Sequence, residues 1–277
     1  MNGYEIVDGV LDLGKTGLSV IEDKAFWSEK TVRYVIVPDT IEHIGDWAFA
    51  KCANLLSVKF LGPHRPGLFG KDVFKGCERL KEISFSDHDE VTASYMALCA
   101  DQLPYDHLLR GDDAGKKSWY AKWDICLVET LKSDDEKVRV NAALCGEEDI
   151  SYDGIGSVDG EMPGETGDFV QKEEFRKCSL GYFRLSHDRF LEDTTRAVIT
   201  DHIRNNMFGC GSGSSFYSIF EEQEETISYL RIYLDITKPD RNTLLAMAES
   251  VKAKDVFAAS YLIKEAAGED TLGLLML

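Results

Sequence analysis

Cysteine and histidine are the residue types in this chain with the widest range of chemistry, because thiolates and imidazoles bind metal ions or act as nucleophile and base. No two cysteines form a C-x-x-C pair, and no histidine lies at zinc-site spacing from another histidine or a cysteine. We therefore expect buried, reduced thiols rather than a metal site, a disulfide framework or a Cys–His nucleophile. The seven cysteines are Cys52, Cys77, Cys99, Cys126, Cys145, Cys178 and Cys210, and the six histidines are His43, His64, His88, His107, His187 and His202.

Two glycine-rich segments have residue types that bind ions elsewhere. Residues 209–215 read GCGSGSS, but a phosphate loop needs a Gly-Lys-Ser/Thr between a strand and a helix, and both neighbours here have helical patterns. Residues 153–165 are rich in glycine and acids, but their spacing is not that of a calcium-binding EF-hand loop. We interpret the first segment as a linker and the second as part of a mobile acidic loop at about 150–168.

The remaining chemical candidates are few. The G-x-S-x-G motif of serine hydrolases is absent. Trp119 and Trp123 lie four residues apart, with Tyr120 beside them, so they share one face of a predicted helix. Such a pair is either an exposed platform for a sugar or peptide, or part of a core. We favour the core.

The charge of the chain is unevenly distributed. The net charge is −18, and residues 1–86 carry 12 acidic and 11 basic side chains, whereas residues 87–277 carry the other 37 and 20. Repulsion between this acidic part and phosphate disfavours nucleic acid and anionic membranes as partners. The first residues have no signal-peptide pattern, and the unpaired cysteines favour a reducing compartment, so we expect a cytoplasmic protein.

The first third of the chain repeats one apolar pattern, which must position whatever chemistry this part carries. Its phenylalanines Phe26, Phe49 and Phe74 lie 23 and 25 residues apart, and the flanking apolar residues keep their offsets. A period of this length is typical of a solenoid, in which each unit buries its apolar face against its neighbours. The copies are Ile21, Ala25, Phe26, Val32, Val35, Val37; Ile44, Ala48, Phe49, Cys52, Leu55, Val58, Phe60; and Phe69, Val73, Phe74, Cys77, Leu80, Ile83, Phe85.

Each copy is predicted to hold a short helical or turn segment around its phenylalanine, followed by a strand. Side chains alternate along a strand, so one set of residues faces the core and the other faces solvent. Residues 4–11 alternate in the same way around Asp8-Gly9, which indicates a β-hairpin that caps the solenoid. The inward residues are Val35, Val37, Val58, Phe60, Ile83 and Phe85, and the outward residues are Tyr34, Ile36, Ser57, Lys59, Glu82 and Ser84.

The middle repeat resembles a known family. Residues 37–58 read VPDTIEHIGDWAFAKCANLLSV, which is similar to the unit IPxxVxxIGxxAFxxCxxLxxI of BspA-like leucine-rich repeats. The third repeat is also similar, and the first has Glu29 in place of the cysteine and no glycine before its Ala-Phe. The resemblance covers about residues 4–86, and it implies a fold rather than a reaction.

After Ser86 the repeat ends and helical patterns begin, at about 89–102, 117–132, 134–146, 169–186 and 191–206. The last helices contain a duplication, in which apolar residues recur 29 positions later as a helix, a turn and a second helix. Residues 243–248 and 255–256 resemble a degenerate ankyrin unit that lacks the proline and histidine of the consensus. The equivalent residues are Phe216, Ile219, Ile227, Leu230 and Leu234 in one copy and Leu245, Ala248, Val256, Ala259 and Ile263 in the other.

The sequence therefore predicts an α+β protein with three parts. Residues 1–86 form a short leucine-rich-repeat solenoid with a hairpin cap and about three repeats, residues 87–208 form a helical domain, and residues 209–277 form paired-helix repeats. Repeat modules present surfaces and contain no built-in reactive group. We expect a non-catalytic scaffold that binds a protein partner, with no cofactor, no metal and no catalytic residue.

Two alternatives remain open at this point. One is an enzyme with its site at the junction of the solenoid and the helical domain, and the other is an extracellular adhesion module. For the scaffold, the natural contact surface is the outward sheet face with Tyr34, Ile36, Ser57, Lys59, Glu82 and Ser84. Tyr34 and Ile36 are the anchors on it, and the acidic helical part is expected to steer a basic partner toward the protein.

Overall fold

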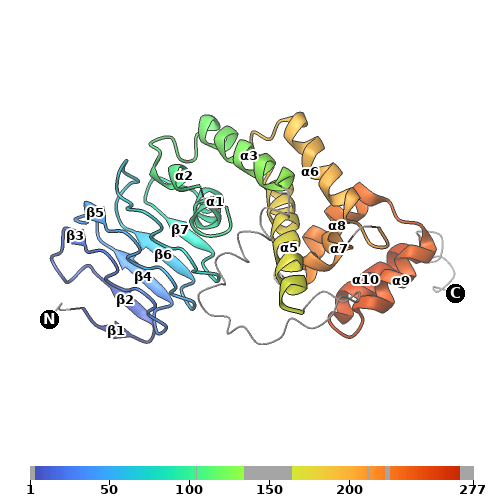
Figure 1. The fold of residues 1–277 in the computed structure, drawn as a ribbon, viewed down its shortest axis with the longest axis horizontal. Helices are drawn as coiled ribbons and strands as arrows, with labels where there is room; N and C mark the ends of the chain where they lie inside the picture. The colour runs from blue at the N-terminus through green and yellow to red at the C-terminus, as the bar shows by residue number, and fades with distance from the viewer. Residues whose placement is uncertain (1–3, 104, 134–163, 211, 222–224, 269–277) are drawn as a thin grey trace, which may run out of the picture. The chain divides into compact units, whose positions relative to one another are not determined.

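The computed structural model describes residues 4–103, 105–133, 164–210, 212–221 and 225–268 (Figure 1). The chain divides into two compact units, residues 1–127 and 128–277. The first contains a solenoid and the helices that follow it, and the second is helical. The division lies beyond the predicted boundary at residue 86, because the first helices after the repeats pack with them.

The solenoid is built on a five-stranded sheet in the order β1-β2-β4-β6-β7 (Figure 1). β1 is antiparallel to β2, and the other neighbours are parallel, so the predicted hairpin cap and about three turns of solenoid are confirmed. A second sheet, which the sequence analysis missed, pairs β3 with β5 and continues through an Ile44–Phe69 bridge. The strands are β1 Ile6–Val7, β2 Val10–Asp12, β3 Val20–Ile21, β4 Tyr34–Val37, β5 His43–Ile44, β6 Ser57–Phe60 and β7 Glu82–Ser84.

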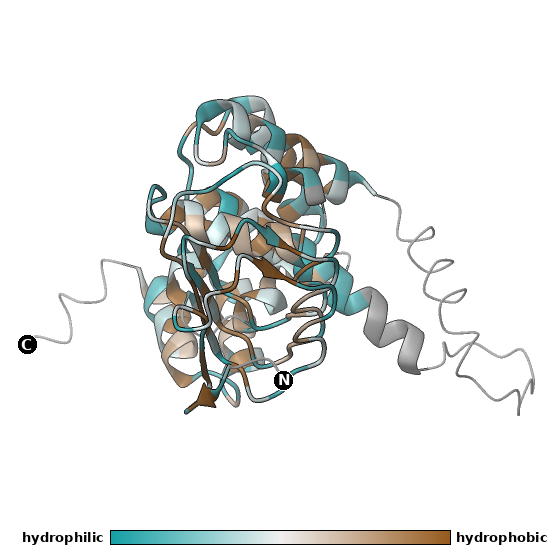
Figure 2. Cartoon of the chain, turned by 90° about the vertical axis from the view of Figure 1, so that its left-hand side faces the viewer, coloured by the Kyte–Doolittle hydropathy of each residue, from teal (hydrophilic) through white to brown (hydrophobic). Residues whose placement is uncertain are grey.

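The repeated apolar residues stack in columns between successive turns of the solenoid. Phe26, Phe49 and Phe74 form one column, with ring centroids 4.9 and 5.7 Å apart. Phe60 and Phe85 stack at 4.3 Å in a second column. The sheet strands are among the brown, hydrophobic segments in Figure 2. Each repeat therefore buries its apolar side chains against the equivalent side chains of its neighbours, as the period predicts.

The segments around the phenylalanines are turns rather than helices. The residues two positions before each phenylalanine, Lys24, Trp47 and Asp72, all have positive φ. Two positions after it, Ser28, Lys51 and Gly76 do so too. Left-handed residues at both points reverse the chain within each coil, which a continuous right-handed helix cannot do.

The sheet ends at a covering helix. α1, Glu90–Ala100, packs on β7, and its N-cap residue Asp89 accepts a hydrogen bond from the Thr92 backbone N–H at 2.8 Å. α2, Asp106–Arg110, and α3, Lys117–Lys132, follow. The predicted core role of the tryptophan pair is confirmed, because Trp119 and Trp123 are fully buried around Tyr95.

The described part of the second unit consists of helices joined by turns and loops. The predicted helices near 169–186 and 191–206 are present as α5 and α6, whereas the one predicted at 134–146 lies outside the described residues. The helices are α5 Gly164–Ser186, α6 Asp193–Asn205, α7 Ser214–Tyr217, the 3₁₀ helix η1 Ser218–Phe220, α8 Thr226–Thr237, α9 Arg241–Val251 and α10 Val256–Ala267.

Two predicted loops differ from the structure. The acidic loop predicted at 150–168 is wrong at its end, because α5 already begins at Gly164; the rest lies outside the described residues. In the glycine/serine segment, Ser214 and Ser215 are buried, and Ser215 donates to the Ile203 carbonyl at 2.9 Å. The end of this segment, residues 213–215, therefore packs within the helical unit.

The two halves of the predicted duplication differ in packing. α9 and α10 form a helix pair, but the earlier copy has only the four-residue α7 and η1 in place of α9. Phe216 is buried, whereas its equivalent Leu245 is 42% exposed. The ankyrin resemblance is not confirmed and stays a prediction.

Candidate interaction surface

The parallel register of the solenoid brings the six predicted surface residues together on one sheet face. Tyr34 pairs with Ser57, and Ser57 with Glu82; Ile36 pairs with Lys59, and Lys59 with Ser84. Their neighbours in the strands, which point to the other side, are all buried. Tyr34 is 42% exposed and Lys59 is exposed, while Ile36, Ser57, Glu82 and Ser84 are half-buried. The structure thus places these side chains in two rows across three strands.

The face extends onto the hairpin, which the sequence analysis missed. Val10 pairs with Tyr34, and Asp12 pairs with Ile36, so both lie on the same face as their partners. Val7, opposite Val10 in the antiparallel pair, is 55% exposed. The alternation in residues 4–11 showed the hairpin, but only the pairing of β2 with β4 shows that its residues continue the face.

The chemical character of this face changes across the sheet. On β1, β2 and β4 it is apolar apart from the exposed Asp12, and the Arg33 guanidinium lies over the Tyr34 ring at 5.9 Å from its centroid. On β6 and β7 it is polar, and the Ser57 hydroxyl donates to the Glu82 carboxylate at 3.4 Å. We name the apolar part, Val7, Val10, Tyr34 and Ile36, the apolar patch. An apolar area bordered by polar groups is typical of protein contact surfaces.

The predicted core thiols are buried and hydrogen-bonded. The Cys52 thiol donates to the Phe26 carbonyl at 3.2 Å, and the Cys77 thiol donates to the Phe49 carbonyl at 3.1 Å, each one repeat back. The neighbouring Cys52 thiol and burial raise the pKa of Cys77. Burial also raises the pKa of Cys99 and Cys178. Cys77, Cys99 and Cys178 are therefore protonated at neutral pH and are poor nucleophiles, whereas the neighbouring Cys77 thiol lowers the pKa of Cys52.

Two histidines that the sequence analysis treated as scattered lie together in the first unit. The rings of His64 and His88 stack with centroids 5.5 Å apart, and the His64 Nε2 is 2.9 Å from the Leu109 carbonyl oxygen. Burial lowers the pKa of His88, with the nearby His64 contributing in the same direction. His64 and His88 are 24 residues apart, which is one repeat period. This spacing in the sequence could have predicted that they lie together in adjacent coils.

The helical unit contains an open cavity of about 420 Å³. Phe175, Phe220 and Val251 form its apolar lining, and the Lys254 ammonium pairs with the Glu221 carboxylate at 2.8 Å on its border. Ser250 also lines it, but its hydroxyl donates to the Met247 carbonyl at 2.7 Å. The described lining residues include no nucleophile placed beside a base.

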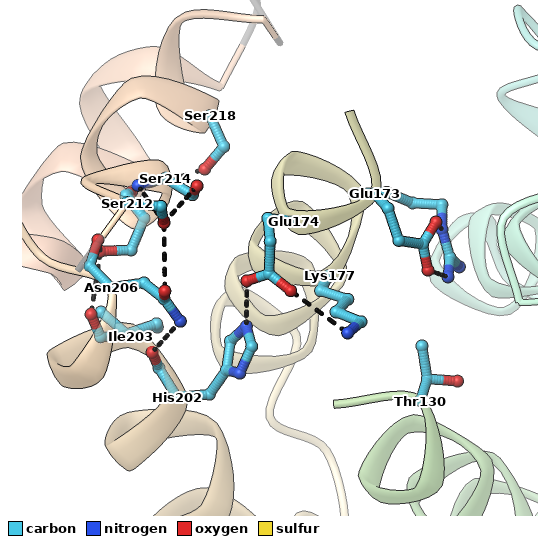
Figure 3. A network of polar contacts seen from close by, with 12 residues as sticks. Thr130, Glu173, Glu174, Lys177, His202, Ile203, Asn206, Ser212, Ser214 and Ser218 are labelled. Atoms are coloured by element: carbon cyan, nitrogen blue, oxygen red, sulfur yellow. Dashed lines mark hydrogen bonds and ion pairs between the residues drawn. The ribbon is translucent and has the colours of Figure 1, made fainter. Parts of the chain in front are cut away.

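Charged groups are also buried inside the helical unit (Figure 3). The Lys177 ammonium lies 3.2 Å from the Glu174 carboxylate and donates to the Ser133 carbonyl at 3.1 Å. The His202 Nε2 lies 3.7 Å from the other Glu174 oxygen. Lys177 is 1% exposed, so this network joins α5 to α6 inside the unit rather than forming an accessible site.

Within the described residues, no group of three or more histidine, cysteine, aspartate or glutamate side chains is arranged to hold a metal ion. None of the helices in the described part of the chain combines the length and apolar character needed to cross a bilayer.

Comparison with protein families finds one match. Residues 13–101 match the model of the BspA type leucine-rich repeat region, in six copies. A search of curated proteins and of solved structures finds no match for this chain. The match agrees with the stacked coils described above, and a repeat region of this kind indicates a role in protein–protein interaction or adhesion.

Proposed function

We propose that this protein is a non-catalytic interaction protein whose solenoid binds a protein partner through the outward face of its sheet. The observation that carries this proposal is the apolar patch, where two strands of the hairpin cap and the first repeat strand align the exposed Val7 and Tyr34 with the half-buried Val10 and Ile36. The inward residues of β2 and β4, Leu11, Val35 and Val37, are buried in the core. The outward face is therefore the part of the sheet that remains available for a partner.

The Arg33–Tyr34 pair is the proposed anchor of this contact. Tyrosine and arginine dominate the energetics of protein interfaces, because they bury a large area at a small cost in conformational entropy. The Arg33 guanidinium already lies near the Tyr34 ring, so little ordering is needed on binding. The polar rows on β6 and β7 would form the border of the contact, with Lys59 available to an acidic group of the partner.

The acidic part of the chain would act on the rate of association. Residues 87–277 contribute almost all of the net charge of −18. Such a field steers a basic protein toward the molecule and repels nucleic acid and anionic membranes. We also propose a reducing, cytoplasmic location, which the buried free thiols support.

The test compares two variants of the full chain against the partner that co-purifies with it. Tyr34→Ala with Ile36→Ser removes the centre of the apolar patch, and we expect at least tenfold weaker binding by calorimetry. Trp27→Ala is the matched control, because this exposed aromatic residue belongs to a turn segment rather than to the sheet. Equal affinity of the double variant and the wild type would refute the sheet face. Loss of binding at high salt alone would place the contact on the acidic helices.

A further inference from the structure

The last helix of the described chain exposes an unusual amount of apolar surface. In α10, Phe257 is 85% exposed, Val256 is 66% exposed and Ile263 is 52% exposed. The opposite face of the helix is buried through Ala258, Ala259, Leu262 and Ala266. α10 therefore has two apolar faces, and the structure accounts for one of them by packing against the helical unit.

The exposed face is continuous along the helix. At about 100° per residue, six residues lie within about 60° of Ser260 around the helix axis. They are Val256, Phe257, Ser260, Ile263, Lys264 and Ala267, and all are exposed. We call this set the α10 face. It includes no acidic side chain, although the whole chain has a net charge of −18.

We propose that the α10 face binds the same face of a second copy of this chain, with the two helices antiparallel around a two-fold axis near Ser260. Such a contact is isologous, so each residue must complement the residue that symmetry places opposite it. A two-fold axis perpendicular to the plane of the helices preserves the side of each helix on which a residue lies. Val256 and Ile263 lie on one side of Ser260, and Phe257 and Lys264 lie on the other.

The pairs that this symmetry creates are complementary. Val256 meets Ile263 of the second copy, which buries two aliphatic side chains on one side of the axis. Phe257 meets Lys264 of the second copy, and an ammonium group over an aromatic ring is an attractive contact. The two Lys264 side chains stay about 10 Å apart along the helices, because seven residues at about 1.5 Å each separate position 264 from position 257.

The residue at the axis suits close approach of two helices. Ser260 is small, and its hydroxyl donates to the Val256 carbonyl at 2.8 Å, so no donor is left unsatisfied when the face is covered. One helix face buries less area than the roughly 1,200 Å² of small stable interfaces, so we expect a weak dimer with a Kd of about 100 µM.

The first test measures oligomeric state by sedimentation velocity of the full chain from about 1 µM to about 1 mM, a range that brackets the expected Kd. We expect a monomer–dimer equilibrium in the wild type and at least tenfold weaker association for Val256→Ser with Ile263→Ser. Leu245→Ser is the matched control, because it removes an exposed apolar side chain from α9, outside the α10 face. Circular dichroism of each variant checks that it is folded.

The second test examines whether the two copies of α10 meet at Ser260, rather than how tightly the two chains associate. Ser260→Cys, in a background with Cys145→Ser and Cys210→Ser, should form a disulfide-linked dimer under mild oxidation, because residues at a two-fold axis come within reach of each other. Ser250→Cys, an exposed position on α9, is the control and should cross-link at least tenfold more slowly.

Three outcomes would overturn the proposal. The first is a wild-type chain that stays monomeric over the whole concentration range. The second is a dimer whose association is unchanged by Val256→Ser with Ile263→Ser. The third is dimerisation that appears only when residues 269–277 are removed, which would assign the α10 face to that segment instead of to a second copy.

Discussion

The solenoid and the helical unit satisfy their internal polar groups in different ways. In the solenoid, the Asp23 carboxylate accepts from the Asp46 backbone N–H at 2.7 Å, and the Asp46 carboxylate accepts from the Lys71 N–H at the same distance. Each bond joins one repeat to the next. In the helical unit, Lys177 meets Glu174 within α5 and the distant Ser133 carbonyl. The partner of a polar group is therefore set by the period in one unit and by the tertiary fold in the other.

This difference has an energetic consequence. The solenoid repeats small, hydrogen-bonded contacts that keep most charges in solvent, so the loss of one side chain leaves a small defect. The helical unit buries whole ionic groups, and the loss of one partner leaves the other charge uncompensated. We therefore expect the largest effects of single substitutions in the helical unit, although its sequence has no visible motif.

The largest effect is expected for Lys177→Met. Methionine fills a similar volume, but it leaves the buried Glu174 carboxylate without its ammonium partner (Figure 3). It also leaves the Ser133 carbonyl without this donor. Breaking a buried ion pair costs about 3–5 kcal/mol of unfolding free energy. Urea denaturation followed by circular dichroism measures this loss.

Two further variants test whether the broken buried ion pair causes the loss of stability in Lys177→Met. Lys252→Met removes an exposed lysine that pairs with Glu249, and it should cost about 0.5 kcal/mol or less. Adding Glu174→Gln to Lys177→Met should restore part of the stability, because it removes a buried carboxylate that has lost its ammonium partner. Equal losses of unfolding free energy in Lys177→Met and Lys252→Met would show that the buried ion pair contributes no more to stability than the exposed one.

The second prediction concerns the closeness of the solenoid coils. A Cβ atom on Gly45 would lie 2.4 Å from the Asp23 carboxylate and 2.5 Å from the Asp23 backbone nitrogen. Backbone cannot move aside as a side chain can, so Gly45→Ala should cost roughly 2–4 kcal/mol by forcing adjacent coils apart.

Gly14→Ala is the matched control, since its Cβ would meet only the Asp12 side-chain oxygen, at 3.0 Å. Thermal melting of both variants measures the difference. A Gly45→Ala protein as stable as Gly14→Ala would mean that the Asp23–Asp46 ladder can open at little cost.

The same contrast explains how much the sequence could predict. In the solenoid, the repeated spacing around Phe26, Phe49 and Phe74 predicted the coils and the burial of Cys52 and Cys77. It also predicted the six outward residues of the sheet face, Tyr34, Ile36, Ser57, Lys59, Glu82 and Ser84. The continuation of the face onto Val10 was missed, because the register between a hairpin and a repeat strand depends on pairing that no period encodes.

In the helical unit, periodicity predicted α5 and α6 but not what they enclose. Lys177 and Arg184 appear in the sequence as ordinary charged residues of an amphipathic helix, yet both are almost fully buried. Burial of a charge depends on partners from other segments, such as the Ser133 carbonyl that accepts from Lys177 at 3.1 Å. The exposed α10 face was missed because Val256 and Ile263 were interpreted only as members of the 29-residue duplication, and Phe257 is not part of that pattern.

The third prediction tests the solenoid thiols. Cys77→Ala removes a buried sulfur and its hydrogen bond to the Phe49 carbonyl, and it should cost about 1–2 kcal/mol. Cys210→Ala should have almost no effect, because Cys210 is exposed. In the native wild type, a thiol reagent should modify Cys210 within minutes and leave Cys52 and Cys77 unmodified. Rapid labelling of Cys77 would contradict its place in the core.

The smallest effect is expected for the pH dependence that His88 contributes near the end of the solenoid. Burial lowers the pKa of His88 in the folded protein, and His64 acts in the same direction, while Asp87 and Asp89 act against them. The unfolded chain therefore binds this proton at higher pH, near the ordinary histidine pKa of about 6.5. The stabilising contribution is complete above that pH and is lost as the pH falls below it.

His88→Phe keeps a ring against His64 and Phe85 but cannot bind a proton, so it should reduce the loss of stability between about pH 7 and pH 5. Unfolding free energies at several pH values measure this slope. His43→Phe, which changes an exposed histidine of the same solenoid, is the matched control. If His88→Phe and the wild type lose stability equally on acidification, the proton that destabilises this unit binds elsewhere. The stacked histidines would then contribute packing alone, like the phenylalanine columns beside them.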